Sequence, residues 1–121
     1  MDGNEPGYDL EERTFQFALA VRTCISGSKW TRVQWSDVDQ VLRSSGSVAA
    51  NYTEANNAVS KPDFLLRIRI SKKEASETKL WLRLLGATSP DETTKTTLRA
   101  LFKEADELTR ILATILRNSS K

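Results

Sequence analysis

Residues 60–86 read SKPDFLLRIRISKKEASETKLWLRLLG, and they carry the clearest indication of the fold. Ser60 and Asp63 form a capping-box signature, and Pro62 falls in the first helical turn, where its missing N–H is tolerated. Behind that start, a seam of apolar and small residues recurs at intervals of three and four: Phe64, Ile68, Ser71, Ala75, Thr78, Leu82 and Leu85. The pattern predicts one long amphipathic helix over 61–86.

Three more stretches repeat this pattern of a short polar residue, a carboxylate three positions later and then an apolar seam. The paired residues are Asp9 with Glu12, Ser36 with Asp39 and Ser89 with Glu92. They predict three further helices, over about 9–26, 36–58 and 90–118. Strand-like alternation with a period of two is not sustained anywhere in the sequence.

The connections between these helices are short, apart from the stretch 26–35, which carries Trp30 and Trp35. Short loops between helices of similar length favour antiparallel neighbours. We therefore expect an all-α protein, an up-down-up-down antiparallel four-helix bundle that forms a single domain over 1–121.

Composition excludes several classes of function. The chain has 121 residues, with 18 Lys and Arg, 16 Asp and Glu and no His, which gives a net charge of +2. Without His, the chain lacks His-based acid–base catalysis and the Glu-x-x-His ligands of di-iron bundles. Cys24 is the single cysteine and falls on an apolar seam, so we expect a buried and inert thiol. We expect no enzymatic activity, no metal and no cofactor.

The sequence shows no sign of export or of membrane insertion. The first residues, MDGNEPGYDLEER, are acidic and lack the apolar region of a secretory signal. No stretch approaches the roughly 20 apolar residues that a membrane span needs. We expect a cytoplasmic protein that makes no contact with a membrane.

The predicted helix over 61–86 carries a second apolar row outside its core seam, consisting of Leu66, Ile70, Trp81 and Leu84. One small bundle covers two apolar faces of a helix only when that helix is central, or when another chain covers the second face. We expect this row to form the interface of a homo-oligomer, with Trp81 as its anchor. A wide core face within one chain is the alternative.

A third face of the same helix is basic, because Arg69, Lys72, Lys79 and Arg83 recur at helical spacing. Such a stripe can follow a phosphate backbone, and a homo-oligomer would repeat it in every subunit. The alternative is an ordinary solvated face neutralised by Glu74 and Glu77. No exposed aromatic residues interleave with the stripe, so readout of single-stranded bases is not expected.

The predicted helix over 36–58 contains a run of small residues, SSGSVAA at 44–50. Gly46 lies within this run, and glycine is unfavourable in a helix interior. The run therefore indicates a close approach between helices. A polar binding strip of Ser47, Asn51 and Glu54 is the alternative.

Segments along nearly the whole chain carry a resemblance to a known family: YDLEERTF (8–15), LRS (42–44), ANYTEAN (50–56), SKPDF (60–64), KEASETKLWLRLL (73–85) and EADEL (104–108). The chain resembles the bacterial four-helix bundle family that includes proteins encoded within intervening sequences of large-subunit ribosomal RNA genes. The resemblance implies a cytoplasmic, up-down bundle that assembles into a homopentameric ring and has no enzymatic activity. One departure is Ala49, which stands where the family pattern has Gly.

That family is similar to the accessory protein of diversity-generating retroelements, also a pentameric bundle, which binds nucleic acid and a reverse transcriptase through basic surfaces. By this resemblance, the candidate nucleic-acid contacts are Arg43, Arg69, Lys72, Lys79 and Arg83. Two hypotheses follow. The protein is either an RNA- or nucleic-acid-binding accessory protein that uses a repeated basic stripe, or a protein–protein scaffold in which the stripe is ordinary surface.

Overall fold

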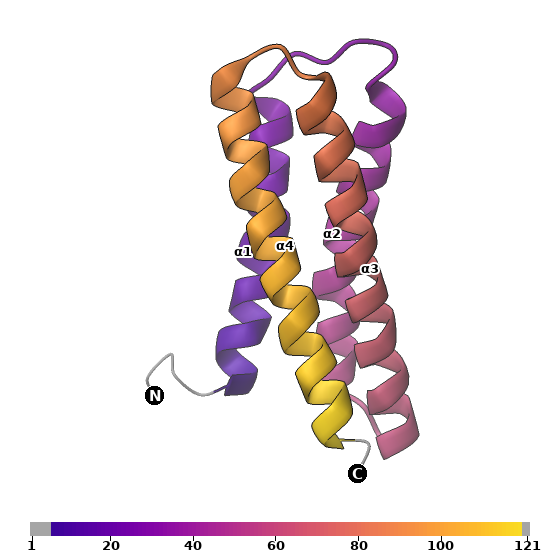
Figure 1. The fold of residues 1–121 in the computed structure, drawn as a ribbon. Coiled ribbons are helices and arrows are strands. Elements are labelled where there is room, and N and C mark those ends of the chain that lie inside the picture. Colours follow the sequence, from indigo (N-terminus) through magenta and orange to yellow (C-terminus); the bar gives the residue numbers. More distant parts are fainter. Residues whose placement is uncertain (1–5, 120–121) are drawn as a thin grey trace.

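The structure, a computed structural model, describes residues 6–119, with side chains from Leu10 onward. This part of the chain folds into the helices α1 (Pro6–Ser26), α2 (Trp35–Asn56), α3 (Lys61–Thr88) and α4 (Glu92–Ser119), and contains no strand. In Figure 1 the helices alternate in direction, so that α1 begins and α4 ends at the same end of the bundle. The predicted all-α, up-down-up-down four-helix bundle is confirmed.

The helices follow one another around the bundle in chain order. Helix α3 packs extensively against both α2 and α4, whereas α1 packs against α2 and makes its fewest contacts with α4. The α1–α4 side is therefore the least tightly packed side of the bundle, and α3 is the most embedded helix.

The predicted seams form the core. Val21, Val38, Ile68 and Leu108 are fully enclosed, and Cys24 is buried beside them. Burial raises the pKa of the Cys24 thiol, so the inert protonated form is favoured. Completely burying a side chain of this size stabilises the fold by about 1.5–3 kcal/mol.

The α2–α3 contact also buries hydroxyl groups, and each has a partner. Ser71 donates to the carbonyl of Val48 at 2.8 Å. The hydroxyl of Thr78 lies 2.8 Å from Ser44 Oγ and 2.6 Å from the carbonyl of Glu74. Small hydroxyl residues let the two backbones approach closely without leaving an unpaired buried polar group.

The space beside Gly46 holds a side chain of another helix, and not the closely packed backbone that the sequence predicts. The guanidinium of Arg22, on α1, lies over this glycine and donates to the carbonyls of Ala18 and Leu42, both at 3.0 Å. A Cβ atom at position 46 would stand 3.0 Å from Arg22 Nη2. The glycine therefore makes room for a side chain that joins α1 to α2.

Of the four predicted capping boxes, only the one at Ser60 starts a helix as expected. Ser60 is the N-cap of α3, and its hydroxyl accepts from the backbone N–H of Asp63 at 3.2 Å. This bond satisfies one of the N–H groups that the first helical turn leaves free.

The other three predicted cap residues are wrong, although each helix begins within three residues of its predicted start. Helix α1 begins at Pro6, so Asp9 lies inside the helix, and its side chain is outside the described residues. Helix α2 begins at Trp35, and its N-cap is Gln34, two residues before the predicted cap Ser36. Helix α4 begins at Glu92. Its cap is Asp91 and not the predicted Ser89, because Asp91 Oδ2 accepts from the backbone N–H of Thr94 at 2.9 Å.

Two of the predicted helix ends differ by two residues. Helix α2 ends at Asn56 rather than at 58, and α3 continues through Gly86 to Thr88. Ser89 then adopts an extended conformation with ψ of 130°, as expected for a residue that precedes a proline. The chain therefore leaves α3 at the proline and not at the glycine. Between Pro6 and Ser119, none of the helices combines the length and apolar character of a membrane span.

Candidate nucleic-acid interface

The basic stripe of α3 lies on the flank of the helix that faces α4. Lys79 marks this flank, because its Nζ pairs with Asp106 Oδ1 of α4 at 3.1 Å. Arg69 and Arg83 are exposed and Lys72 is half-buried. Within residues 10–119, these three cations have no ion-pair partner, so their charges are available at the surface.

Arg43 does not join this stripe. It extends from α2 to the opposite flank of α3, where Nη1 lies 3.2 Å from Glu74 Oε2 and Nη2 lies 3.6 Å from Glu77 Oε2. The hydrogen bond with Glu74 raises the pKa of Arg43. Two carboxylates thus compensate this cation, and the structure separates it from the other predicted nucleic-acid contacts.

Helix α4 supplies a second basic row, which was not predicted from the sequence. The row consists of Lys95, Arg99, Lys103, Arg110 and Arg117. Steps of four and seven residues keep such positions on one side of a helix. Arg99 and Lys103 are exposed and have no ion-pair partner among the described residues. The signal was present in the sequence but was obscured by the acidic residues interspersed with the row.

Those acidic residues face elsewhere or are already paired. Glu104 and Glu107 bind Arg13 of α1, with Arg13 Nε 2.7 Å from Glu104 Oε2 and Nη2 3.1 Å from Glu107 Oε2. Asp106 lies between Lys79 and Arg110, at 3.1 Å and 3.0 Å. Glu104 and Glu107 are therefore engaged by a cation from outside the two rows, whereas Asp106 compensates part of the charge of Lys79 and Arg110.

Together the two rows form a continuous surface, which we call the α3–α4 basic face: Arg69, Lys72, Lys79, Arg83, Lys95, Arg99, Lys103, Arg110 and Arg117. Two observations join the rows. Lys79 and Arg110 share one carboxylate, and Arg83 lines the same groove as Lys95 and Arg99.

The charge of the bundle is divided between its two halves. Helices α1 and α2 contain six acidic and three basic residues, whereas α3 and α4 contain twelve basic and seven acidic residues. The overall charge of +2 hides this division. The excess of positive charge among the helices is therefore carried by the α3–α4 half of the bundle.

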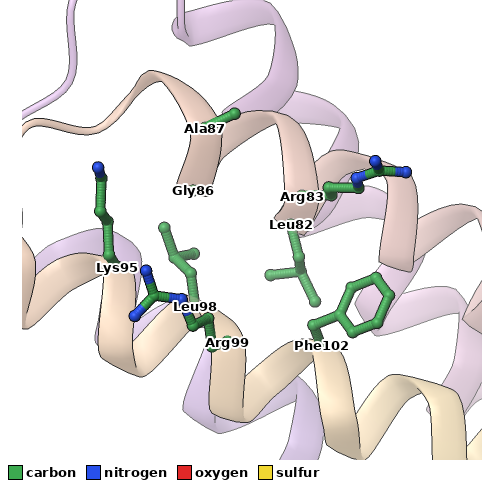
Figure 2. Close-up of a pocket in the computed structure, with 8 residues that line it drawn as sticks. All are labelled: Leu82, Arg83, Gly86, Ala87, Lys95, Leu98, Arg99 and Phe102. Carbon is green, nitrogen blue, oxygen red and sulfur yellow. The ribbon is translucent and has the colours of Figure 1, made fainter.

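A groove of about 430 Å³ opens in the basic face, close to the α3–α4 connection. Leu82 and Leu98 provide apolar walls, and Phe102 stands beside them. Figure 2 shows the Phe102 ring rising from α4 next to Leu82, with Arg83 on the opposite helix. Arg99 and Lys95 follow along the α4 side. The groove thus combines an apolar interior with a cationic rim.

The predicted interface row of α3 lies on the other flank. Leu66 is 49% exposed and Leu84 is 38% exposed, while Ile70 is half-buried. Glu77, the partner of Arg43, lies about three helical turns from Leu66 and about two turns from Leu84. The apolar row is therefore on the same side of α3 as Glu77, which is the side that faces α2. Trp81 packs partly against the core, and its buried Nε1 has no acceptor among the described residues.

The alternative polar strip on α2 is largely used within the chain. Asn51 Nδ2 donates to the carbonyl and hydroxyl of Ser47, at 2.9 Å and 3.0 Å. Asn51 Oδ1 accepts from Arg67 at 3.4 Å. Between residues 10 and 119, no His, Cys, Asp and Glu side chains gather in a group suited to a metal ion.

Comparison with known proteins agrees with this architecture. The family described as the 23S rRNA-intervening sequence protein matches residues 9–114, and the chain belongs to this family. Among solved structures, a protein of unknown function from the S23 ribosomal protein family of Bacteroides thetaiotaomicron VPI-5482 is similar. It is 26% identical, with 92% of this chain and 97% of that chain covered and a TM-score of 0.78. None of the curated proteins matches. The resemblance seen in the sequence is confirmed.

Proposed function

We propose that the protein is a non-enzymatic, homo-oligomeric accessory protein that binds RNA or another nucleic acid through the α3–α4 basic face. The observation that carries this proposal is the alignment of unpaired cations from two neighbouring helices. Arg69, Lys72 and Arg83 come from α3, and Arg99 and Lys103 come from α4. A basic stripe on a single helix is often an ordinary solvent-exposed surface. Two adjoining basic rows with few unpaired carboxylates are more typical of a nucleic-acid-binding surface.

The dimensions of the face suit a phosphate backbone. Arg99 and Arg117 are separated by five helical turns, which is about 27 Å at 1.5 Å per residue. Neighbouring helices lie about 8–10 Å apart, so the two rows border a strip of that width. Several consecutive phosphates can meet cations along such a strip, and binding would release their counterions.

Oligomerisation is compatible with this role because the two surfaces lie on opposite flanks of α3. The apolar row with Leu66 and Leu84 is on the α2 side, and the basic face is on the α4 side. A second copy covering the apolar row would leave the basic face open. Repeating the face in every subunit would add the separate patches into a larger field, as expected for the pentamer that the family resemblance implies.

The binding test compares two double variants of equal charge change. Arg99→Ala with Lys103→Ala removes two cations of the basic face, and Lys29→Ala with Arg32→Ala removes two exposed cations from the α1–α2 connection. Fluorescence anisotropy with a labelled RNA at low salt should show weaker binding for the first variant, by about tenfold, because each lost phosphate contact removes counterion release.

The matched variant at Lys29 and Arg32 should keep an affinity within about twofold of the wild type, since these two cations lie on the α1–α2 connection, outside the two rows that form the basic face. Equal losses in the two variants would show that the basic face has no special part in binding. No binding by the wild-type protein would favour the protein–protein scaffold.

A further inference from the structure

The groove in the basic face brings an aromatic ring next to phosphate-binding side chains. Phe102 of α4 is half-buried and lines the groove with Leu82 and Leu98. Arg83 and Arg99 stand at its rim, and no carboxylate lines it among the described residues. The sequence did not indicate this arrangement, because the aromatic and one of its neighbouring cations lie on different helices.

Gly86 keeps the groove open. It lies inside α3, where the helix continues to Thr88, so it serves no turn. A Cβ at this position would approach the Cβ of Leu98 to 4.0 Å, an ordinary contact that introduces no clash. The surrounding atoms therefore do not require a glycine here, and its missing side chain adds to the open space of the groove that Gly86 lines.

The chemistry of the groove selects a ligand with a flat apolar body and a nearby anionic group. Its volume falls within the range of about 300–1,000 Å³ that small-molecule sites occupy. Apolar walls and an aromatic ring suit a nucleobase, and the guanidinium groups at the rim suit the adjoining phosphates. A base in a duplex is paired and stacked and cannot enter, whereas a single strand can turn a base outward.

We propose that this groove receives one unstacked base of a single-stranded nucleic acid, with the neighbouring phosphates on Arg83 and Arg99. The inference rests on the proposed function of the basic face and specifies its substrate class. The rest of the face binds phosphates of any strand, and the groove adds a preference for single strands over duplexes.

The test measures the affinity of three RNA probes of equal length by fluorescence anisotropy: a single strand, the same strand with abasic sites, and a duplex. Phe102→Leu keeps an apolar side chain and removes the aromatic face. It should weaken single-strand binding by about tenfold, the effect of losing one stacked base, and should leave the duplex within about twofold. The abasic strand should bind the wild type and this variant equally.

Two further variants separate stacking from folding. Phe15→Leu makes the same change at an exposed position of α1 and should leave all three affinities unaltered. Gly86→Leu fills the groove with a residue that favours helices, so the protein should melt no lower while single-strand binding falls by about tenfold.

Equal losses for strand and duplex in Phe102→Leu, or no loss in either folded variant, would overturn the inference while leaving the proposed function intact. A polyglutamate peptide that bound as tightly, with the same dependence on Phe102, would also overturn it. Absence of wild-type binding to all three probes would remove the proposed function itself, and the inference with it.

Discussion

Asp91 shows how one side chain fixes the start of a helix. Its Oδ2 accepts from the backbone N–H of Thr94 at 2.9 Å and from the hydroxyl of Thr94 at 2.6 Å. These two hydrogen bonds lower the pKa of Asp91 below its ordinary value of 3.8, and the bond from the Thr94 hydroxyl has the larger effect. Because the ionised carboxylate is the form that caps α4, the cap works above this pH.

We predict that Asp91→Ala lowers the melting temperature at pH 7, and that Ser89→Ala, at the position the sequence pattern indicated, does not. The difference should shrink as the pH falls below 3.8, since a carboxyl group with a lowered pKa stabilises the fold above its unfolded pKa and loses this effect on protonation. Thermal melts followed by circular dichroism would check it. A larger loss in Ser89→Ala would mean that the cap is misassigned.

Arg22 and Gly46 are coupled, because the guanidinium of Arg22 lies over the glycine. Gly46→Ala should gain up to about 1 kcal/mol of helix propensity, but the new Cβ displaces the guanidinium from its bond to the Leu42 carbonyl. We therefore predict little net change in the wild type and a clear stabilisation, of about 0.5–1 kcal/mol, when Arg22 is already Ala. Urea unfolding of the two single variants and the double variant measures this coupling, and additive effects would contradict it.

At the scale of helices, the α1–α4 contact depends on Arg13. This is the least extensive helix pair, and Arg13 binds Glu104 through two bonds of 2.7 Å and 2.9 Å. A two-point guanidinium–carboxylate pair is stronger than an ordinary surface pair. The pair thus ties α1 to α4 and also turns Glu104 away from the basic face.

We predict a coupling free energy of about 1 kcal/mol between Arg13→Ala and Glu104→Ala in a double-mutant cycle. The single-contact pair of Lys73 and Glu77, 3.9 Å apart on one exposed helix face, should couple by only about 0.3–0.5 kcal/mol. Denaturant unfolding provides both values. Equal coupling free energies in the two pairs would show that Arg13 links α1 to α4 no more strongly than an ordinary surface ion pair.

The helices themselves could be predicted because their apolar seams recur with a clear period, and these seams are the buried core. Their ends could not, since capping is decided by which nearby side chain reaches the free N–H groups. At α4 the carboxylate of Asp91 reaches Thr94, although Ser89 fits the pattern equally well. Long-range ties such as Arg22 over Gly46 leave no local signal.

Of the two basic rows of the candidate site, only the row on α3 was predicted from the sequence. The row on α3 was visible because its cations stand at regular spacing in one stretch. The row on α4 was hidden because Glu104, Asp106 and Glu107 lie among its cations, and only the fold shows that Arg13 and Lys79 engage these carboxylates. The inclusion of Arg43 rested on the family resemblance, and the structure places it on the opposite flank.

For the whole molecule, we propose that self-association covers the exposed apolar row of α3. Leu66 and Leu84 of α3 are about half and more than a third exposed. Such residues rarely remain uncovered in clusters on a monomer. The family resemblance implies a pentamer, so light scattering of the wild type should give about five times the chain mass of 13.6 kDa.

We predict that Leu66→Asp with Leu84→Asp yields folded monomers, because two charges cannot be buried unpaired in an interface. Val59→Asp, at a position that is 95% exposed in the α2–α3 connection, is the control and should keep the assembly. Circular dichroism verifies that the double variant remains helical. An unchanged mass in that variant would exclude this row as the interface.

The salt dependence of RNA binding is the sharpest check on the α3–α4 basic face, because it counts the phosphates that this face neutralises. We predict that the logarithm of the association constant falls linearly with the logarithm of salt concentration, and that Arg99→Ala with Lys103→Ala reduces the slope by about 1.4–1.8. A slope that is close to zero, or one that these two substitutions leave unchanged, would contradict the claim that the α3–α4 basic face binds nucleic acid.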